Sequence, residues 1–353
     1  MSSNFSYKDS VPIENVLYGQ FIKYNRLNDM YNFEFECKPP LVNVYIDLYQ
    51  MILPLYNFYR VDNPMGLSSA LINMAIHYRN FFYKYNTYSN IFMIYSPTMS
   101  VNNTRFCPEY NNKYTNRIIN NKEVYDIVNN SINIIGTIVP YLKNIYFKTG
   151  TVETSVMVYD LVSKFEANKY IVPSFFVTSS QYAFQLPAAN PRIYLFYKKK
   201  SKTKEDISYT VNNSNALDCF IAETRNQHIP KTNLNQSWLS GFMTLSGLPK
   251  REIKSIYSYK EAIKILDNIK DSYNVIRPDI MIEVANKLYK KSVDPNIIEN
   301  RFNCIDLMYQ LSLYRILPES KEKAFLTDLN DMDELLRIND IYFKNNPINL
   351  DKL

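Results

Sequence analysis

Runs of apolar residues divide the first two thirds of the chain into short strands and longer helices. Runs typical of strands occupy residues 41–49, 91–95, 144–147, 170–177 and 192–197, and helical spacing of apolar residues predicts helices over 66–83, 122–141 and 152–168. Strands that alternate with helices in this way indicate parallel strands within one sheet. The predicted fold class is therefore α/β, with a central, mostly parallel sheet flanked by helices.

The pattern changes after Trp238. Little strand pattern follows, and amphipathic spacing predicts helices over 259–270, 278–291, 303–315 and 321–340. The first forty residues are polar and aromatic and end at Lys38-Pro39-Pro40. We therefore expect an N-terminal extension (residues 1–40), an α/β domain (residues 41–238) and a helical C-terminal region (residues 239–353).

Composition removes several classes of chemistry. The chain has only 6 glycines and 2 histidines. Neither of the Gly-rich phosphate-binding patterns, G-x-G-x-x-G and G-x-x-x-x-G-K-[ST], occurs. Without a histidine close to a nucleophile, a catalytic triad is not expected. No cysteine has a Cys or His partner at metal-ligand spacing, so we expect reduced, buried thiols rather than a zinc site; the four are Cys37, Cys107, Cys219 and Cys304.

Composition also bears on partners and location. The net charge of +6 is compatible with a nucleic-acid partner but does not require one. Residues 1–10 lack the pattern of a signal peptide, and no apolar run has the length of a membrane span. We expect an intracellular protein without a membrane partner. The 31 tyrosines and frequent asparagines indicate an AT-rich coding sequence, as in many viruses and phages, which would place the protein in the host cytoplasm or the virion.

One segment after a predicted strand points to a family. Thr178–Leu186 (TSSQYAFQL) resembles the T-G-D-x-D-L-x-Q-L pattern of the flap endonuclease or 5′-nuclease family, and of its phage RNase H-like branch in particular. Thr178, Gln185 and Leu186 fit this pattern, whereas Ser180 and Tyr182 stand at the two aspartate positions. In the family these aspartates hold divalent metal at the carboxyl end of a strand.

Further segments resemble the same family in the same order along the chain. Residues 44–47 are similar to its first strand, which ends in a metal-binding aspartate, here Asp47. Residues 94–96 with 105–113 are similar to a strand end followed by R-x-x-x-P-x-Y-K-x-N-R, with Ser96 in place of an aspartate and Arg117 as the trailing arginine. Residues 151–156 are similar to the start of its E-A-D-D helix. Glu153 is kept there, and Ser155 and Val156 take the aspartate positions.

The resemblance implies a PIN-like nuclease-fold domain over residues 41–238. In the helical region, residues 245–262 resemble a degenerate helix-three-turn-helix, which in the family grips duplex phosphates through backbone N–H groups and a bound monovalent cation. Its usual Gly-rich turn is degraded here. Residues 300–307 are similar to a late L-I-D-L-like stretch of phage members.

The metal site that the resemblance implies lacks most of its carboxylates. The positions of this vestigial metal site are Asp47, Ser96, Glu153, Ser155, Ser180 and Tyr182. Two-metal phosphodiester hydrolysis needs a cluster of carboxylates, and a hydroxyl replaces a carboxylate poorly around Mg²⁺. Asp160 lies about 10 Å along the helix from Glu153, so we interpret it as a solvated or capping acid. We therefore expect no catalytic residues, no metal, no cofactor and no enzymatic activity.

Basic residues near these segments are the candidates for nucleic-acid contact. They are Arg105, Lys113, Arg117, Lys198, Lys199, Lys200, Lys250, Arg251 and Lys254. The lysines at 198–200 are read as a loop at the end of a strand. Interleaved tyrosines are candidates for stacking on unpaired bases, namely Tyr110, Tyr114, Tyr257 and Tyr259.

Three functions remain open from the sequence. The first is a catalytically inactive 5′-nuclease-like protein, viral or from a phage, that binds DNA or RNA. The second is a protein–protein scaffold, or a subunit of a viral structural, transcription or replication complex, whose partners are viral or replication and transcription proteins. The third is a residual metal-dependent 5′-nuclease.

Overall fold

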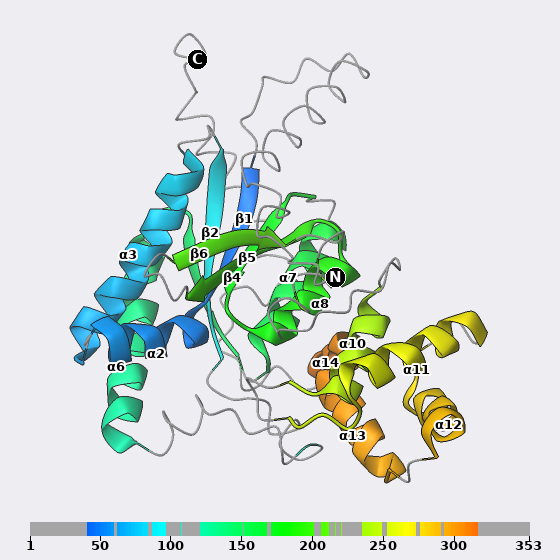
Figure 1. Ribbon diagram of the computed structural model, residues 1–353. Helices are drawn as coiled ribbons and strands as arrows, with labels where there is room; N and C mark the ends of the chain where they lie inside the picture. Colours follow the sequence, from blue (N-terminus) through cyan, green and yellow to red (C-terminus); the bar gives the residue numbers. More distant parts are fainter. Residues whose placement is uncertain are drawn as a thin grey trace, which may run out of the picture.

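The computed structural model shows a sheet between two layers of helices, with a further group of helices at one end (Figure 1). It describes residues 41–59, 62–83, 87–96, 107, 121–150, 152–167, 171–200, 206–211, 216, 220, 235–248, 253–272, 276–290 and 293–316. The predicted N-terminal extension and the helix predicted over 321–340 lie outside these residues. No helix in the described part of the chain is long and apolar enough to cross a membrane.

The sheet has 6 strands in the order β3-β2-β1-β4-β5-β6. Pairing from β3 through β5 is parallel, and β6 pairs antiparallel with β5. The predicted parallel α/β fold is therefore confirmed. The strands are β1 (Leu41–Asp47), β2 (Tyr88–Tyr95), β3 (Ile145–Thr149), β4 (Ser174–Thr178), β5 (Ile193–Lys200) and β6 (Asp206–Val211).

The strand order reverses beside β1. The chain runs outward from β1 through β2 to β3, then returns to place β4 on the other side of β1. In open parallel sheets, such a switch point leaves a crevice at the carboxyl ends of the two strands, where ligands commonly bind. Here this switch point lies beside Asp47, the last residue of β1, and Thr178, the last residue of β4, and we call this place in the fold the crevice.

Each face of the sheet carries its own apolar core. Val42, Val44 and Ile46 of β1 face one core, with helices α2, α3 and α6. Tyr45 faces the other core, with α7 and the C-terminal helices, because successive strand side chains point to opposite faces. The helices are α2 (Leu48–Tyr59), α3 (Pro64–Tyr83), α6 (Lys122–Ile138) followed by the 3-10 turn η2 (Val139–Tyr141), α7 (Thr154–Ala167), the 3-10 turn η3 (Gln181–Phe184) and α8 (Gln185–Ala189).

The C-terminal third is helical, as the pattern predicts. Its helices are α10 (Gln236–Ser246), α11 (Tyr259–Ser272), α12 (Pro278–Tyr289), α13 (Pro295–Ile305) and α14 (Leu307–Ile316). The expected domain division between residues 238 and 239 lies inside α10. Trp238 is buried in the same apolar core as residues of α7 and of the later helices.

Two predictions about the C-terminal helices and the lysine cluster are wrong. The single helix predicted over 303–315 is interrupted at Asp306, whose backbone is extended (φ −67°, ψ 119°). The lysines at 198–200 do not form a loop: they belong to β5, and the backbone at Lys198 pairs with Ser208 of β6. The charge of these lysines led to the wrong prediction of a loop. The sequence also did not predict α2, because Pro54 lies inside it and proline is unfavourable in a helix interior.

Candidate functional site

Asp47 is the acid at the centre of the crevice. It is only 2% exposed, and three donors reach its carboxylate. The hydroxyl of Thr178 donates to Oδ2 at 2.9 Å, the hydroxyl of Thr154 donates to Oδ1 at 3.3 Å, and the backbone N–H of Gln50 donates to Oδ1 at 3.3 Å. The carboxylate thus links β1 to β4, to the start of α7 and to the first turn of α2.

The environment of Asp47 favours its neutral form. Its pKa is raised from 3.8 to about 7: burial is the largest cause and the nearby charge of Glu153 adds to it, while the hydrogen bonds from Thr178, Gln50 and Thr154 oppose the rise. A bound divalent cation would act in the opposite direction, because an opposite charge favours the ionised form. The crevice is therefore built around a buried carboxyl group and hydroxyls.

The other positions of the metal site that the resemblance implies add no carboxylate beside Asp47 except Glu153. Ser180 follows β4 and donates its backbone N–H to the hydroxyl of Thr178 at 3.0 Å. Ser155 is buried in the first turn of α7, and Ser96 is buried after β2. Tyr182 is fully buried among apolar side chains rather than exposed to the crevice.

The other acids of α7 are committed to structural ion pairs. Asp160 is 1% exposed and accepts from Arg315 at 2.8 Å and from Lys164 at 3.0 Å. Its interpretation as a solvated or capping acid is wrong, because Arg315 of α14, 155 residues away, packs against it.

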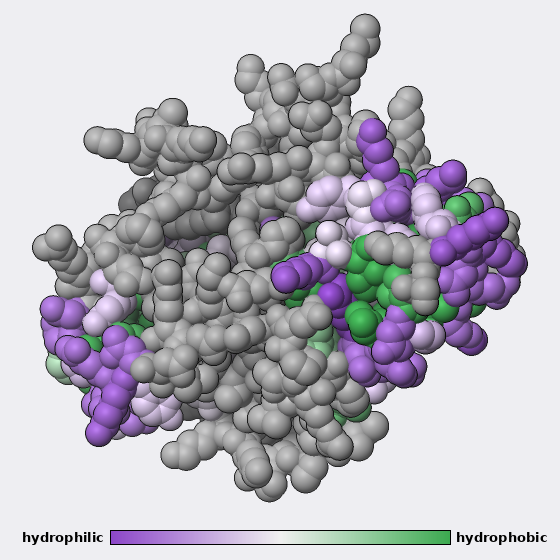
Figure 2. Space-filling model, turned by 60° about the horizontal axis from the view of Figure 1, so that its bottom comes forward, coloured by the Kyte–Doolittle hydropathy of each residue, from purple (hydrophilic) through white to green (hydrophobic). Residues whose placement is uncertain are grey.

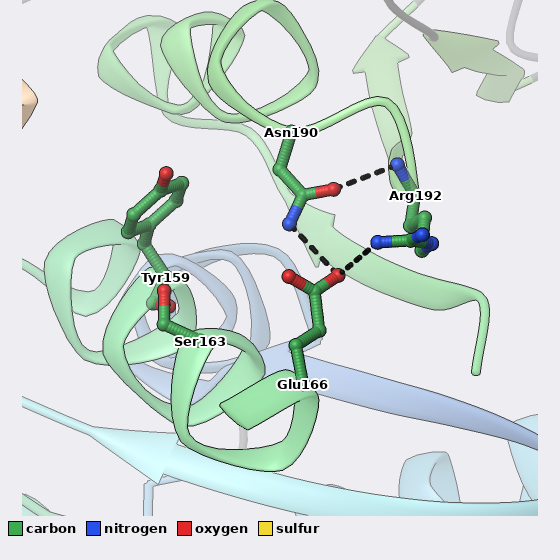
Figure 3. A network of polar contacts seen from close by, with 5 residues as sticks. All are labelled: Tyr159, Ser163, Glu166, Asn190 and Arg192. Carbon is green, nitrogen blue, oxygen red and sulfur yellow. Dashed lines mark hydrogen bonds and ion pairs between the residues drawn. The ribbon is translucent and has the colours of Figure 1, made fainter. Parts of the chain in front are cut away.

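Glu166 is also held away from the crevice. It binds the side chains of Asn190 at 3.1 Å and Arg192 at 3.0 Å, and the side-chain oxygen of Asn190 accepts the backbone N–H of Arg192 (Figure 3). These contacts join the end of α7 to the turn before β5.

The donor set does not fit a two-metal centre. In the described part of the chain, no group of three or more His, Cys, Asp or Glu side chains is arranged to hold a metal ion. Asp47 and Glu153 are the acids that meet at the crevice, and both oxygens of Asp47 already accept hydrogen bonds from the protein. Two-metal catalysis requires more anionic oxygen than this.

The motif residues that match the family pattern have structural roles here. Thr178 holds Asp47, and Leu186 is fully buried. The side-chain oxygen of Gln185 accepts the backbone N–H of Leu307 at 3.1 Å, and its amide donates to the carbonyl of Ile305 at 2.8 Å. Gln185 therefore clamps the break between α13 and α14 against α8.

A buried polar network completes this junction. The side-chain amide of Gln236 on α10 donates to Gln185 at 3.0 Å and to Asp306 at 2.9 Å. Asp306 also accepts the backbone N–H of Tyr309 at 2.7 Å, which caps the first turn of α14. The sequence shows Asp306 as one polar residue among many, and only its buried partners explain the break.

The turn between α10 and α11 presents exposed lysines. Lys254 is exposed in the turn, and Lys260 and Lys264 are exposed one turn apart on α11. Sequence reasoning missed Lys260 and Lys264, although their spacing of four on a predicted helix was available as a signal. Figure 2 shows hydrophilic side chains gathered over this side of the molecule, around a smaller apolar area.

Two of the tyrosines predicted to stack on bases pack against other rings of the protein. Tyr257 is 1% exposed and packs against Tyr289, with 5.9 Å between ring centroids. Tyr259 is half-buried and stacks on Phe242 at 5.8 Å. The stacking predicted for Tyr257 is therefore wrong.

For Lys198, Lys199 and Lys200 only the backbone is described. Seven other candidates lie outside the described residues: Arg105, Tyr110, Lys113, Tyr114, Arg117, Lys250 and Arg251.

Comparison with solved structures identifies the fold. The chain is similar to the flap endonuclease of bacteriophage T5 in a pseudo-enzyme–product complex with DNA and metal ions, with a TM-score of 0.52, 10% identity, and 85% of this chain and 99% of that chain covered. It is also similar to the same phage protein co-crystallised with metal ions, with a TM-score of 0.51 and 11% identity; the match covers 84% of this chain and 99% of that chain. The chain therefore has the 5′-nuclease (PIN-like) fold expected from its motifs. No protein-family model and no curated protein matches it.

Proposed function

We propose that this protein is a catalytically inactive member of the 5′-nuclease fold, of viral or phage origin, that binds nucleic acid. The observation that supports inactivity is the state of Asp47: a buried carboxyl whose two oxygens accept hydrogen bonds from Thr154, Thr178 and the backbone of Gln50. A cation entering this crevice would have to displace those donors and would find Glu153 as the second acid.

Nucleic-acid binding is supported by the exposed lysines around α11. Lys254, Lys260 and Lys264 form no ion pair with any residue that the structure describes, whereas Lys164 and Lys287 both have carboxylate partners. Unpaired exposed cations are the groups that neutralise backbone phosphates. DNA or RNA is therefore the proposed partner.

A cleavage assay tests inactivity. We expect no cleavage of 5′-flapped DNA in Mg²⁺ or Mn²⁺ and no rise of the melting temperature with either ion. A residual nuclease would instead show metal-dependent cleavage that is lost in Asp47→Ala. The melting temperature separates an inactive protein from one that binds metal without cutting.

A salt titration tests binding. Fluorescence anisotropy with single-stranded DNA, flapped duplex and RNA should show affinity that falls linearly with the logarithm of salt concentration. Lys254→Ala should lower that slope by about one. Lys287→Ala is the matched control, because Lys287 is an exposed lysine already paired with Glu283 at 2.7 Å. Binding that is absent, or indifferent to salt, would refute the proposal.

One observation favours the scaffold alternative. The carboxylate of Glu261 accepts the backbone N–H of Ser258 at 2.7 Å and its hydroxyl at 2.8 Å, so a capping box closes the start of α11. A helix N-terminus binds phosphate through free N–H groups, and here an internal carboxylate lies beside them. If the protein binds none of the three nucleic acids, the protein–protein scaffold is the function that remains.

A further inference from the structure

A buried arginine lies behind the turn that carries Lys254. Arg301 of α13 is 5% exposed, and its Nη1 donates to the backbone carbonyl of Lys254 at 2.7 Å. A buried guanidinium is costly unless its donors are used. The acceptor here belongs to a segment 47 residues away in the chain, between α10 and α11.

That segment is compact and held by its own backbone. Gly247 has φ of +77°, and a Cβ there would lie 2.3 Å from the carbonyl oxygen of Ile253, so glycine is required. Leu248 and Ile253 form a backbone pair at 3.0 and 3.3 Å. The carbonyl of Leu245 accepts two N–H groups, from residues 256 and 257.

Lys254 lies on the outer side of this turn. Its backbone carbonyl is directed to the buried guanidinium, while its side chain is exposed. Arg301 therefore fixes the main chain from which the exposed ammonium group extends. Lys260 and Lys264 follow on the exposed face of α11. Like charges one helical turn apart repel each other, which favours an anionic partner for this face.

We infer that Arg301 is a positioning residue, which holds the turn so that Lys254 meets a phosphate of the nucleic-acid backbone. The inference rests on the proposed nucleic-acid binding and extends it to a residue that does not touch the ligand. Arg301 acts through the carbonyl of Lys254. Its loss should therefore matter only while the lysine side chain is present.

A double-mutant cycle tests this dependence, with anisotropy on 5′-flapped duplex DNA as the readout. Lys254→Ala and Arg301→Met should each weaken binding by roughly 3- to 10-fold, the effect of losing about one phosphate contact. The double variant should bind like the weaker of the two single variants. Arg277→Met is the matched control, because Arg277 is an exposed arginine paired with Asp279 on α12.

Arg301→Lys keeps the test decisive if Arg301→Met unfolds, and hydrogen exchange follows the turn itself in the folded variants. Arg301→Lys retains the charge and one donor, so it should recover part of the affinity. Hydrogen exchange of the backbone amides at residues 253–258 should quicken in Arg301→Met and less so in Arg301→Lys. Unchanged exchange, full affinity in a folded variant, or additive losses in the cycle would overturn the inference. Failure of the unaltered protein to bind any nucleic acid would instead refute the proposed function.

Discussion

Asp47→Asn is the sharpest test of how the crevice is built. The substitution keeps the shape of the side chain and removes the ability to ionise. In the folded protein the Asp47 carboxyl is fully buried and reaches Thr154 and Thr178. Ionising it in this environment is unfavourable, which is why its pKa is raised to about 7.

The magnitude follows from the pKa difference. A rise from 3.8 to about 7 is about three units, and at about 1.4 kcal/mol per unit the linked free energy is about 4 kcal/mol. Because the folded pKa lies above the unfolded one, this stability is fully present below pH of about 4 and is lost as the pH rises through about 7. The side chain is 2% exposed, so solvent screening does not reduce the figure.

The assay is urea unfolding of both proteins between pH 4 and 8, with the free energy of unfolding extrapolated to zero denaturant. The amide does not titrate, so the difference in stability between variant and unaltered protein should shift by about 4 kcal/mol in favour of the variant as the pH rises from about 4 to about 8. Parallel pH profiles would refute the reasoning. So would a stabilisation of the unaltered protein by Mg²⁺ that Asp47→Asn abolishes.

Three other substitutions test the segment between α10 and α11 and the break between α13 and α14. Gly247→Ala should lower stability by about 2 kcal/mol or more, because the left-handed backbone strains any other residue; differential scanning calorimetry checks this against Gly136→Ala, a helical glycine whose added Cβ would be 3.5 Å from its nearest neighbour. Gln185→Met should cost about 1 to 3 kcal/mol, because the backbone N–H of Leu307 loses its acceptor; an unchanged urea midpoint would contradict that role. Glu261→Ala should cost about 1 kcal/mol through the lost capping box, and an unaltered thermal midpoint would argue against the cap.

Much of the sheet could be predicted from local pattern alone. The apolar run ending at Asp47 and the run ending at Thr178 marked two strands whose carboxyl ends meet at the crevice. Such runs are readable because burial on both faces requires continuous apolar residues. The helical third was equally readable from amphipathic spacing. The ends of helices and strands were less predictable, as the unpredicted break at Asp306 shows.

The candidate site was likewise predictable from the sequence only in part. Its location at the end of β1 follows from the order of residues, and the family resemblance implies that Ser155 and Ser180 stand at aspartate positions. The environment of Asp47 does not follow from the order of residues. Thr154 lies 107 residues from Asp47, and Thr178 lies 131 residues away. The sequence contains many serine and threonine hydroxyls, and no local pattern shows which of them donate to Asp47.

By itself, then, the order of residues determined an α/β sheet and a helical C-terminal third, because periodicity and residue type are local properties. Tertiary structure alone decided that Asp160 is buried against Arg315 and that Arg301 reaches the carbonyl of Lys254. Such pairings depend on which helices pack together. The free energy that selects that packing comes from the whole core, and no single segment carries it.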